Sequence, residues 1–246
     1  SSTTVSQPSF AFTLGNTPED LRASILNHLK LSLARDTHTA SRHDWWWATC
    51  QAVRDLCGPG FIIGVKLPGD DGVPGGIALH QAGEIAQALV AAVGVDYLTY
   101  CQGSHHRSLE MHLPDDSYPR QTYMGLIREL KAWTPTVPVM GLGRITDPAE
   151  AEAILARGDA DMIGLGRSLI VDPAWPQKAQ AGRASDIRYC VSCNTCWKTI
   201  NNNRHMGCDN NPRLAQANEL DETLARAPVL RKLAVVGAGI AGLQAR

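Results

Sequence analysis

The sequence predicts an α/β fold made of half of a (βα)8 TIM barrel, a cysteine-rich loop and the first strand and turn of a Rossmann-like domain. Three observations lead to this prediction. Four β-rich runs alternate with helical periods between residues 61 and 167, as βα units on a parallel sheet do. Four cysteines cluster between residues 190 and 208, and a glycine-rich turn follows a β-rich run near residue 237.

Each β-rich run is followed by a helical period. In chain order we predict strand 61–67, helix 77–93, strand 96–100, helix 120–133, strand 137–140, a helix from Pro148 and strand 161–163. The helix after the third strand has the clearest start, because Asp147 can cap it and Pro148 suits its first position. Four units in about 130 residues suit half of a barrel better than a complete doubly wound domain.

The two ends of the chain depart from this rhythm. Residues 17–33 could form a helix, but the leader that contains them has no βα unit. Near the other end, the β-rich run 233–236 opens a glycine turn of the kind that binds dinucleotides, with Gly237, Gly239 and Gly242. We therefore expect a divergent leader at 1–47, a partial barrel at 48–182, a cysteine segment with its connector at 183–230 and a truncated nucleotide-binding start at 231–246.

Composition indicates an ordinary packed interior. Of the 246 residues, 44% are hydrophobic and 19% charged, and the formal net charge is −1. Because the basic residues are scattered, we expect neither nucleic acid nor an anionic membrane surface as a partner. No apolar run approaches the roughly 20 residues of a membrane-spanning helix, and the first residues lack the pattern of a secretory signal. The cysteine usage fits a reducing compartment, so we expect a cytoplasmic protein.

Four cysteines have the spacing of metal ligands. Cys190, Cys193 and Cys196 share one short loop, and Cys208 follows after eleven intervening residues. Thiolates this close together suit a [4Fe–4S] cluster, in which each cysteine binds a different iron. A single zinc ion usually takes its ligands from two separated Cys-x-x-Cys pairs, and the sequence has no second pair. We predict the cluster, with zinc or inert and disulfide-forming thiols as alternatives.

Two Gly-x-Gly-Arg turns, ending in Gly143-Arg144 and Gly166-Arg167, follow the third and fourth predicted strands. In barrels, phosphate often binds at the loops after the last two strands. Glycine lets the backbone approach an anion, and arginine can donate two hydrogen bonds to phosphate oxygens. The turns therefore predict a phosphorylated cofactor. In the alternative, they are only tight turns whose arginines are solvated or paired with Asp147 and Asp172.

Two further polar residues follow the first two strands. Lys66 is expected to end the first strand, either as a cation beside the pyrimidine edge of a flavin or as a solvated lysine. His105 follows the second strand, where a histidine can donate a proton or orient a substrate. Two adjacent histidines on a loop are also ordinary surface residues, so the role of His105 stays open.

Four segments carry a resemblance to a known family: 141–148, 160–167, 172–173 and 186–196. They resemble the old yellow enzyme (NADH:flavin oxidoreductase) family, in the branch that includes trimethylamine dehydrogenase, histamine dehydrogenase and 2,4-dienoyl-CoA reductase. This branch adds an iron–sulfur cluster and a dinucleotide-binding domain to the barrel. The resemblance covers roughly residues 48–246 and implies that the chain is a fragment with the last four βα units.

The resemblance also implies cofactors and their sites. It implies FMN at the barrel mouth, with the cluster exchanging electrons with it. Lys66 falls where the family has an arginine beside the isoalloxazine, and His105 lies near a substrate-facing histidine of the dienoyl reductases. The positions that match phosphate-binding residues are Arg144, Gly166 and Arg167. The turn with Gly237, Gly239 and Gly242 matches one that binds FAD or NAD(P) in a full-length relative.

The implied function is an FMN- and [4Fe–4S]-dependent oxidoreductase. It would oxidise an amine or N-methyl substrate, or reduce an enoyl substrate, with NAD(P)H or another electron carrier as partner. A slight preference for amine oxidation rests on the resemblance at 186–196 and 176–178. In the alternative, the chain is a non-catalytic cofactor-binding fragment, because residues 1–47 show none of the family's first four strands. Half a barrel leaves two unpaired edges, so a homo-oligomer is a further expectation.

Overall fold

The computed structural model describes residues 3–7, 10–14, 44–105, 107–217, 219–220, 228–229, 232, 234–237 and 239, with side chains from residue 47 onward. The strands are β1 (Thr3–Gln7), β2 (Phe10–Leu14), β3 (Gly64–Asp70), β4 (Tyr97–Gln102), β5 (Val139–Gly141) and β6 (Met162–Ile163). The helices are α2 (Asp44–Cys57), α3 (Leu79–Val93), α4 (Leu109–His112), α5 (Met124–Lys131), α6 (Pro148–Ala156), α7 (Arg167–Val171), α8 (Trp175–Gln180), η1 (Ala184–Asp186) and α9 (Thr195–Asn201).

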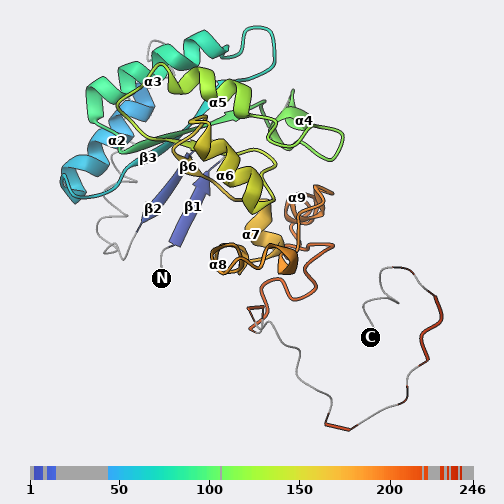
Figure 1. Cartoon of the computed structure of the whole chain (residues 1–246). Coiled ribbons are helices and arrows are strands. Elements are labelled where there is room, and N and C mark those ends of the chain that lie inside the picture. Colours follow the sequence, from blue (N-terminus) through green and yellow to red (C-terminus); the bar gives the residue numbers. More distant parts are fainter. Residues whose placement is uncertain are drawn as a thin grey trace.

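Strands β3 to β6 form one parallel sheet in chain order. Successive strands that lie side by side, each followed by a helix, are the arrangement of a (βα)8 barrel. Helix α3 packs on β3, α5 on β5 and α6 on β6, while the β1–β2 hairpin lies on the other side of the sheet from α3 and α5 (Figure 1). The predicted α/β fold with a parallel sheet is confirmed.

Buried and less buried side chains alternate along β3. Val65 and Leu67 are buried in the hydrophobic core, whereas Lys66 between them is only half-buried. Because successive side chains of a strand point to opposite faces, Lys66 is directed away from the helical layer.

Two aspartate carboxylates form hydrogen bonds and ion pairs near the first residues of the parallel strands. Asp161, just before β6, accepts hydrogen bonds from the Val139 amide at 2.9 Å and from Lys131 Nζ at 2.9 Å. Burial alone would raise the pKa of Asp161, but these two donors lower it below its ordinary value. Between β3 and β4, Asp96 accepts hydrogen bonds from the Ile63 amide at 2.7 Å and from Arg54 Nη2 at 2.9 Å. These pairs lie at the start of the strands, where barrels place residues for stability.

The first strand differs from its predicted limits. It begins at Gly64 rather than at residue 61 and continues to Asp70, so Lys66 is its third residue and does not end it. Pro68 and Gly69, of residue types that are rare in strands, continue it beyond the predicted end at residue 67. Strand β3 lies at the edge of the four-stranded sheet, where the missing amide of Pro68 costs no ladder hydrogen bond.

The helices agree more closely with the sequence. Helix α6 begins at Pro148, and the Asp147 carboxylate accepts a hydrogen bond from the Ala149 amide at 2.7 Å, as expected of the cap. The region 120–133 contains α5, which is shorter than predicted at both ends. The preceding loop contains the short helix α4, for which the sequence held no periodic signal.

The chain ends differ from the expectations in two ways. The leader contains the antiparallel β1–β2 hairpin, with Val5 opposite Phe12, and its expected helix at 17–33 lies outside the described residues. The strand predicted at 233–236 is not formed over residues 234–237, where Val236 is 99% exposed. A strand needs a neighbour for its backbone groups, and no described residue pairs with this segment. Within the described residues, no helix is long and apolar enough to span a membrane.

Candidate cofactor site

A pocket of about 370 Å³ lies between the first residues of β3 and β4, the loops that follow β5 and β6, and the cysteine segment. Its volume is within the range of about 300–1,000 Å³ of small-molecule sites. Loops that follow β5 and β6 supply one wall, β3 and β4 another, and the cysteine segment a third. Of the predicted site residues, the lining includes Lys66, Gly143, Arg144, Gly166, Arg167 and Cys190.

Glycines shape this pocket in two ways. A Cβ at Gly143 would lie 2.6 Å from the ring of Tyr123, and the backbone there has φ 109°. Gly143 is therefore required by the protein itself. A Cβ at Gly166 would meet no protein atom within 4 Å. Contacts with other protein atoms therefore do not explain why residue 166 is a glycine, whereas a ligand that approaches its backbone would. The two glycine turns, which we call the phosphate cradle, fit a bound phosphate in this way.

Both arginines of the glycine turns contact the cysteine segment. Arg144 Nε donates to Ser192 Oγ at 3.1 Å, and Arg167 Nη1 donates to Asn194 Oδ1 at 2.5 Å. The alternative that paired these arginines with two aspartates is wrong, because Asp147 caps α6 and Asp172 contacts Lys178. Each guanidinium carries five N–H donors, so one such contact still leaves donors that could bind an anion.

A buried ion pair holds the cysteine segment against the barrel. Asp172 is fully buried and accepts hydrogen bonds from Lys178 Nζ at 2.8 Å and from the Arg188 amide at 2.9 Å. Burial alone would raise the pKa of Asp172, but these donors and their charges lower it. Trp175 Nε1 adds a hydrogen bond of 2.7 Å to the Thr146 carbonyl.

All four predicted cysteine ligands line one small cavity of about 20 Å³. The Ser192 amide donates to Cys190 Sγ at 3.4 Å, a type of contact that tunes iron–sulfur sites. Burial raises the pKa of the Cys196 and Cys208 thiols. Among the described residues, no group of three or more His, Cys, Asp or Glu side chains is placed so that it could hold a metal ion. Four thiols around one void suit a cluster, in which each binds its own iron, better than one zinc ion.

The predicted histidine lies beside the pocket rather than in its wall. His105 is exposed, and its Nε2 lies 2.9 Å from Nε2 of His112, which does line the pocket. Burial and the positive charge of Lys66 lower the pKa of His105, and they lower that of His112 to about 4. The other side of His105 meets Trp197 of α9 edge-on, with ring centroids 5.3 Å apart.

Sequence reasoning missed four residues of this site: His112, Tyr123, Ser192 and Asn194. Ser192 and Asn194 lie between the cysteine ligands, which could have drawn attention to them. His112 and Tyr123 had no local signal, since α4 and the pocket bring them into place. Tyr123 donates its hydroxyl to the carbonyls of Met111 and His112, at 2.7 and 2.8 Å, and so ties α5 to α4.

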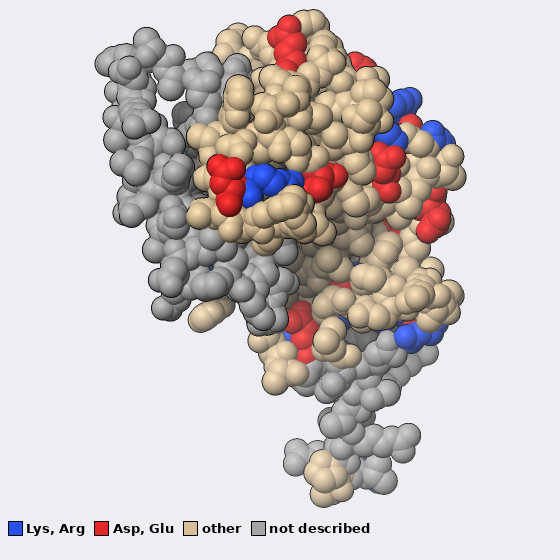
Figure 2. Space-filling model, turned by 90° about the vertical axis from the view of Figure 1, so that its left-hand side faces the viewer, with Lys and Arg blue, Asp and Glu red and all other residues tan. Residues whose placement is uncertain are grey.

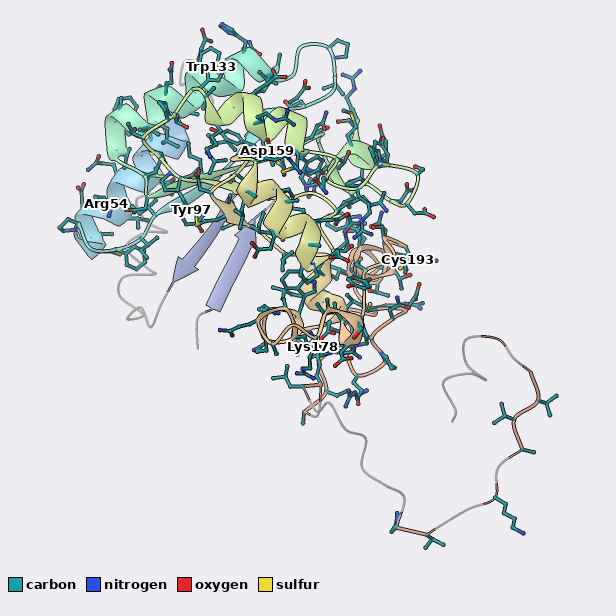
Figure 3. All side chains as sticks on the ribbon, in the orientation of Figure 1. Arg54, Tyr97, Trp133, Asp159, Lys178 and Cys193 are labelled. Atoms are coloured by element: carbon teal, nitrogen blue, oxygen red, sulfur yellow. The ribbon has the colours of Figure 1, made fainter. Side chains whose placement is uncertain are left out.

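The remaining predicted residues lie elsewhere. Gly237 and Gly239 belong to a segment that extends away from the barrel, and Gly242 lies outside the described residues (Figure 1). In the face drawn in Figure 2, acidic and basic side chains of the described residues are interspersed. Figure 3 shows Cys193 beside α9, on the opposite side of the molecule from Arg54 at the base of the sheet.

Residues 39–186 match the NADH:flavin oxidoreductase / NADH oxidase family. The match begins nine residues before the barrel segment expected at 48 and ends just before the cysteine loop. An NADH oxidase of Thermoanaerobacter brockii is 34% identical over 195 residues, which are 78% of this chain and 29% of that protein. The dimethylamine dehydrogenase of Hyphomicrobium sp. (strain x) is 40% identical over 83 residues, 34% of this chain and 11% of the relative.

Among solved structures, a 2-naphthoyl-CoA reductase in complex with 2-naphthoyl-CoA superposes with a TM-score of 0.76. The superposition covers 94% of this chain and 40% of that one at 24% identity, so it shows a shared fold. The chain spans 29% of the length of the NADH oxidase.

Proposed function

Because the chain belongs to the NADH:flavin oxidoreductase / NADH oxidase family, we propose that it carries the FMN and [4Fe–4S] sites of a flavin-dependent oxidoreductase. One observation supports this most directly: the larger pocket and the cysteine-lined cavity share Arg167 and Cys190. Cofactors held in the two cavities would therefore be neighbours. When bound, the flavin would supply two-electron chemistry and the cluster one-electron transfer.

The flavin phosphate is assigned to the two glycine turns. Gly166 offers open space beside its backbone, and Arg144 and Arg167 supply positive charge from neighbouring loops. Lys66 lines the same pocket from β3, where a cation would stabilise negative charge on a reduced ring. A lysine supplies this charge without the two parallel donors of an arginine.

The cluster is assigned to Cys190, Cys193, Cys196 and Cys208. Support comes from the single cavity that they share and from the Ser192 amide directed at the Cys190 sulfur. The range of potentials of such clusters, from about −700 to +450 mV, is set by their surroundings.

His105 is assigned the handling of protons that accompany substrate oxidation or reduction. Its exposed ring is held by His112, and the lowered pKa of both groups keeps them neutral at physiological pH. A neutral imidazole has one nitrogen that accepts, so it can take up a proton, and the imidazolium that forms can then give that proton back.

We propose a small amine or N-methyl compound as the substrate, with an enoyl compound as the alternative. The dimethylamine dehydrogenase relative favours an amine. The resemblance at 176–178 carries no weight for the substrate, because Lys178 is buried in the ion pair with Asp172. NAD(P)H or a protein carrier would be the electron partner. A reducing cytoplasm fits the seven cysteines, all of which are unpaired.

A second candidate is a cofactor-binding module without a complete active site. The described parallel sheet has four strands, and β3 and β6 form its edges. A second copy or another segment would have to cover these edges, which also keeps a homo-oligomer among the proposals.

The experiment is anaerobic reduction of the FMN-loaded full chain, followed by flavin absorption. Bleaching by dimethylamine without NADH is the result we expect. If NADH but not dimethylamine bleaches the flavin, and cinnamate then restores the flavin absorption, the proposed reaction becomes enoyl reduction instead of amine oxidation. Retained flavin that neither compound bleaches, although dithionite does, would favour the binding module. A chain that binds no flavin would refute the proposal.

A further inference from the structure

We propose that Ser192 and Asn194 are positioning residues for the flavin phosphate, so that the cysteine loop forms the outer half of the phosphate cradle. This inference rests on the proposed function and adds a coupling between the two cofactor sites. Phosphate binding and cluster assembly would each strengthen the other, because both depend on one loop conformation.

Ser192 contacts both sites at once. It is 1% exposed, and its hydroxyl accepts the hydrogen bond of 3.1 Å from Arg144 Nε. Its backbone amide donates to Cys190 Sγ at 3.4 Å. A change in the position of the Cys190 sulfur would therefore move the group that orients Arg144.

Asn194 uses both ends of its side-chain amide. Oδ1 accepts from Arg167 at 2.5 Å, and Nδ2 donates to the Leu113 carbonyl at 2.9 Å. Leu113 and Arg167 both line the pocket. The amide therefore spans from the loop after α4 to the start of α7, and its two contacts fix its orientation.

The backbone of the loop makes this arrangement specific. Ser192 and Asn194 have φ values of 57° and 59°, in the left-handed region. Asparagine adopts this conformation more readily than most residues, whereas serine does so at some cost. Neighbouring groups must therefore hold this conformation. They are the two arginines, which contact the side chains, and the cysteines that flank each residue in the sequence.

Anchoring matters because a free arginine loses much rotamer freedom when it binds an anion. A guanidinium that is already held by one hydrogen bond loses less, so its affinity for phosphate is higher. If cluster assembly orders the loop, a cluster-free chain should bind FMN more weakly. By linkage, bound FMN should then stabilise the assembled cluster by the same coupling free energy.

The experiment compares Ser192→Gly and Asn194→Gly with the wild-type full chain. Glycine keeps the left-handed backbone and removes only the side chain. The matched control is Asn203→Gly, because Asn203 has φ 52° and is exposed in the same segment. FMN and riboflavin, which lacks the phosphate, are titrated separately by fluorescence quenching, and iron and sulfide are measured in each preparation.

For each variant we expect FMN affinity to fall roughly tenfold or more, as for a lost hydrogen bond to a charged group, with riboflavin affinity unchanged. Asn203→Gly should match the wild type. Removal of iron from the wild type should weaken FMN but not riboflavin. Variants that bind FMN as tightly as the wild type, or that lose riboflavin equally, would overturn the inference alone. A wild type that binds FMN no better than riboflavin would overturn the assigned phosphate site as well.

Discussion

His105 and His112 bring their Nε2 atoms to 2.9 Å, and of the two only His112 lines the pocket. One ring must donate in this contact and the other accept, so the pair holds one proton between two neutral imidazoles. His112 thus controls how the exposed ring of His105 is presented. The two residues are seven positions apart, joined by a loop and the short helix α4.

The first prediction concerns the pH dependence of stability. Burial, with the charges of Lys66 and His105, lowers the pKa of His112 to about 4, whereas in the unfolded chain it is near 6.5. Between these values the unfolded state binds more protons, so stability falls as the pH falls from about 6.5 to about 4. The slope is at most about 1.4 kcal/mol per pH unit, reduced by partial solvation of the ring. The free energy of unfolding, measured by urea unfolding at several pH values in this range, should show this decrease.

His112→Gln should flatten this dependence, whereas His205→Gln should leave it unchanged because His205 is exposed. Equal slopes in His112→Gln and the wild type would contradict the assignment.

The second prediction tests the charge of Lys66. Its ammonium lowers the pKa of His105 and of His112, second in size to burial. Lys66→Met should therefore raise both pKa values, while Lys66→Arg should retain most of the depression. Proton NMR titration of the imidazole C2 protons measures both. Unchanged titration in Lys66→Met would mean that the lysine points away from the histidines.

The third prediction separates ligand cysteines from core cysteines. Cys193→Ala should abolish iron uptake, because it removes one of the four thiols around the small cavity. Cys101→Ala should retain iron, because Cys101 is a buried residue of β4 with its thiol 3.6 Å from the Leu67 carbonyl. Iron per chain is the measurement. Similar iron contents in the two variants would remove the basis for the ligand assignment.

The fourth prediction concerns the buried ion pair. Asp172→Asn leaves the Lys178 ammonium buried without its counter-charge and should cost about 3 kcal/mol of unfolding free energy. Asp186→Asn is the control, because its pair with Arg183 is half-exposed and should contribute less than about 1 kcal/mol. Urea midpoints at neutral pH distinguish the two. A cost for Asp172→Asn no larger than that of the control would show that the pair does not stabilise the fold.

Local signals predicted most of the sheet and its helices. The Asp147-Pro148 cap is a property of adjacent residues, and α6 begins where it indicates. The limits of β3 depended on its place at the sheet edge, which tolerates Pro68 and is decided by strands far along the chain. A run such as 233–236 forms a strand only beside a partner, so its β-propensity alone was insufficient.

The sequence predicted those site residues whose type alone indicates their role, namely the cysteines and the arginines of the glycine turns. The partners of those arginines were not, since Ser192 and Asn194 lie 48 and 27 residues away. Such contacts depend on the packing of whole elements. The same applies to His112, which enters the site only because α4 folds back toward the pocket.

The most direct test is the iron, acid-labile sulfide and FMN content of the full chain, prepared without oxygen and supplied with FMN. We predict about four irons and four sulfides per chain, as in a [4Fe–4S] cluster, together with one bound FMN. A chain that holds stoichiometric zinc, no sulfide and no flavin would contradict the central claim that these cysteines bind a cluster beside a flavin.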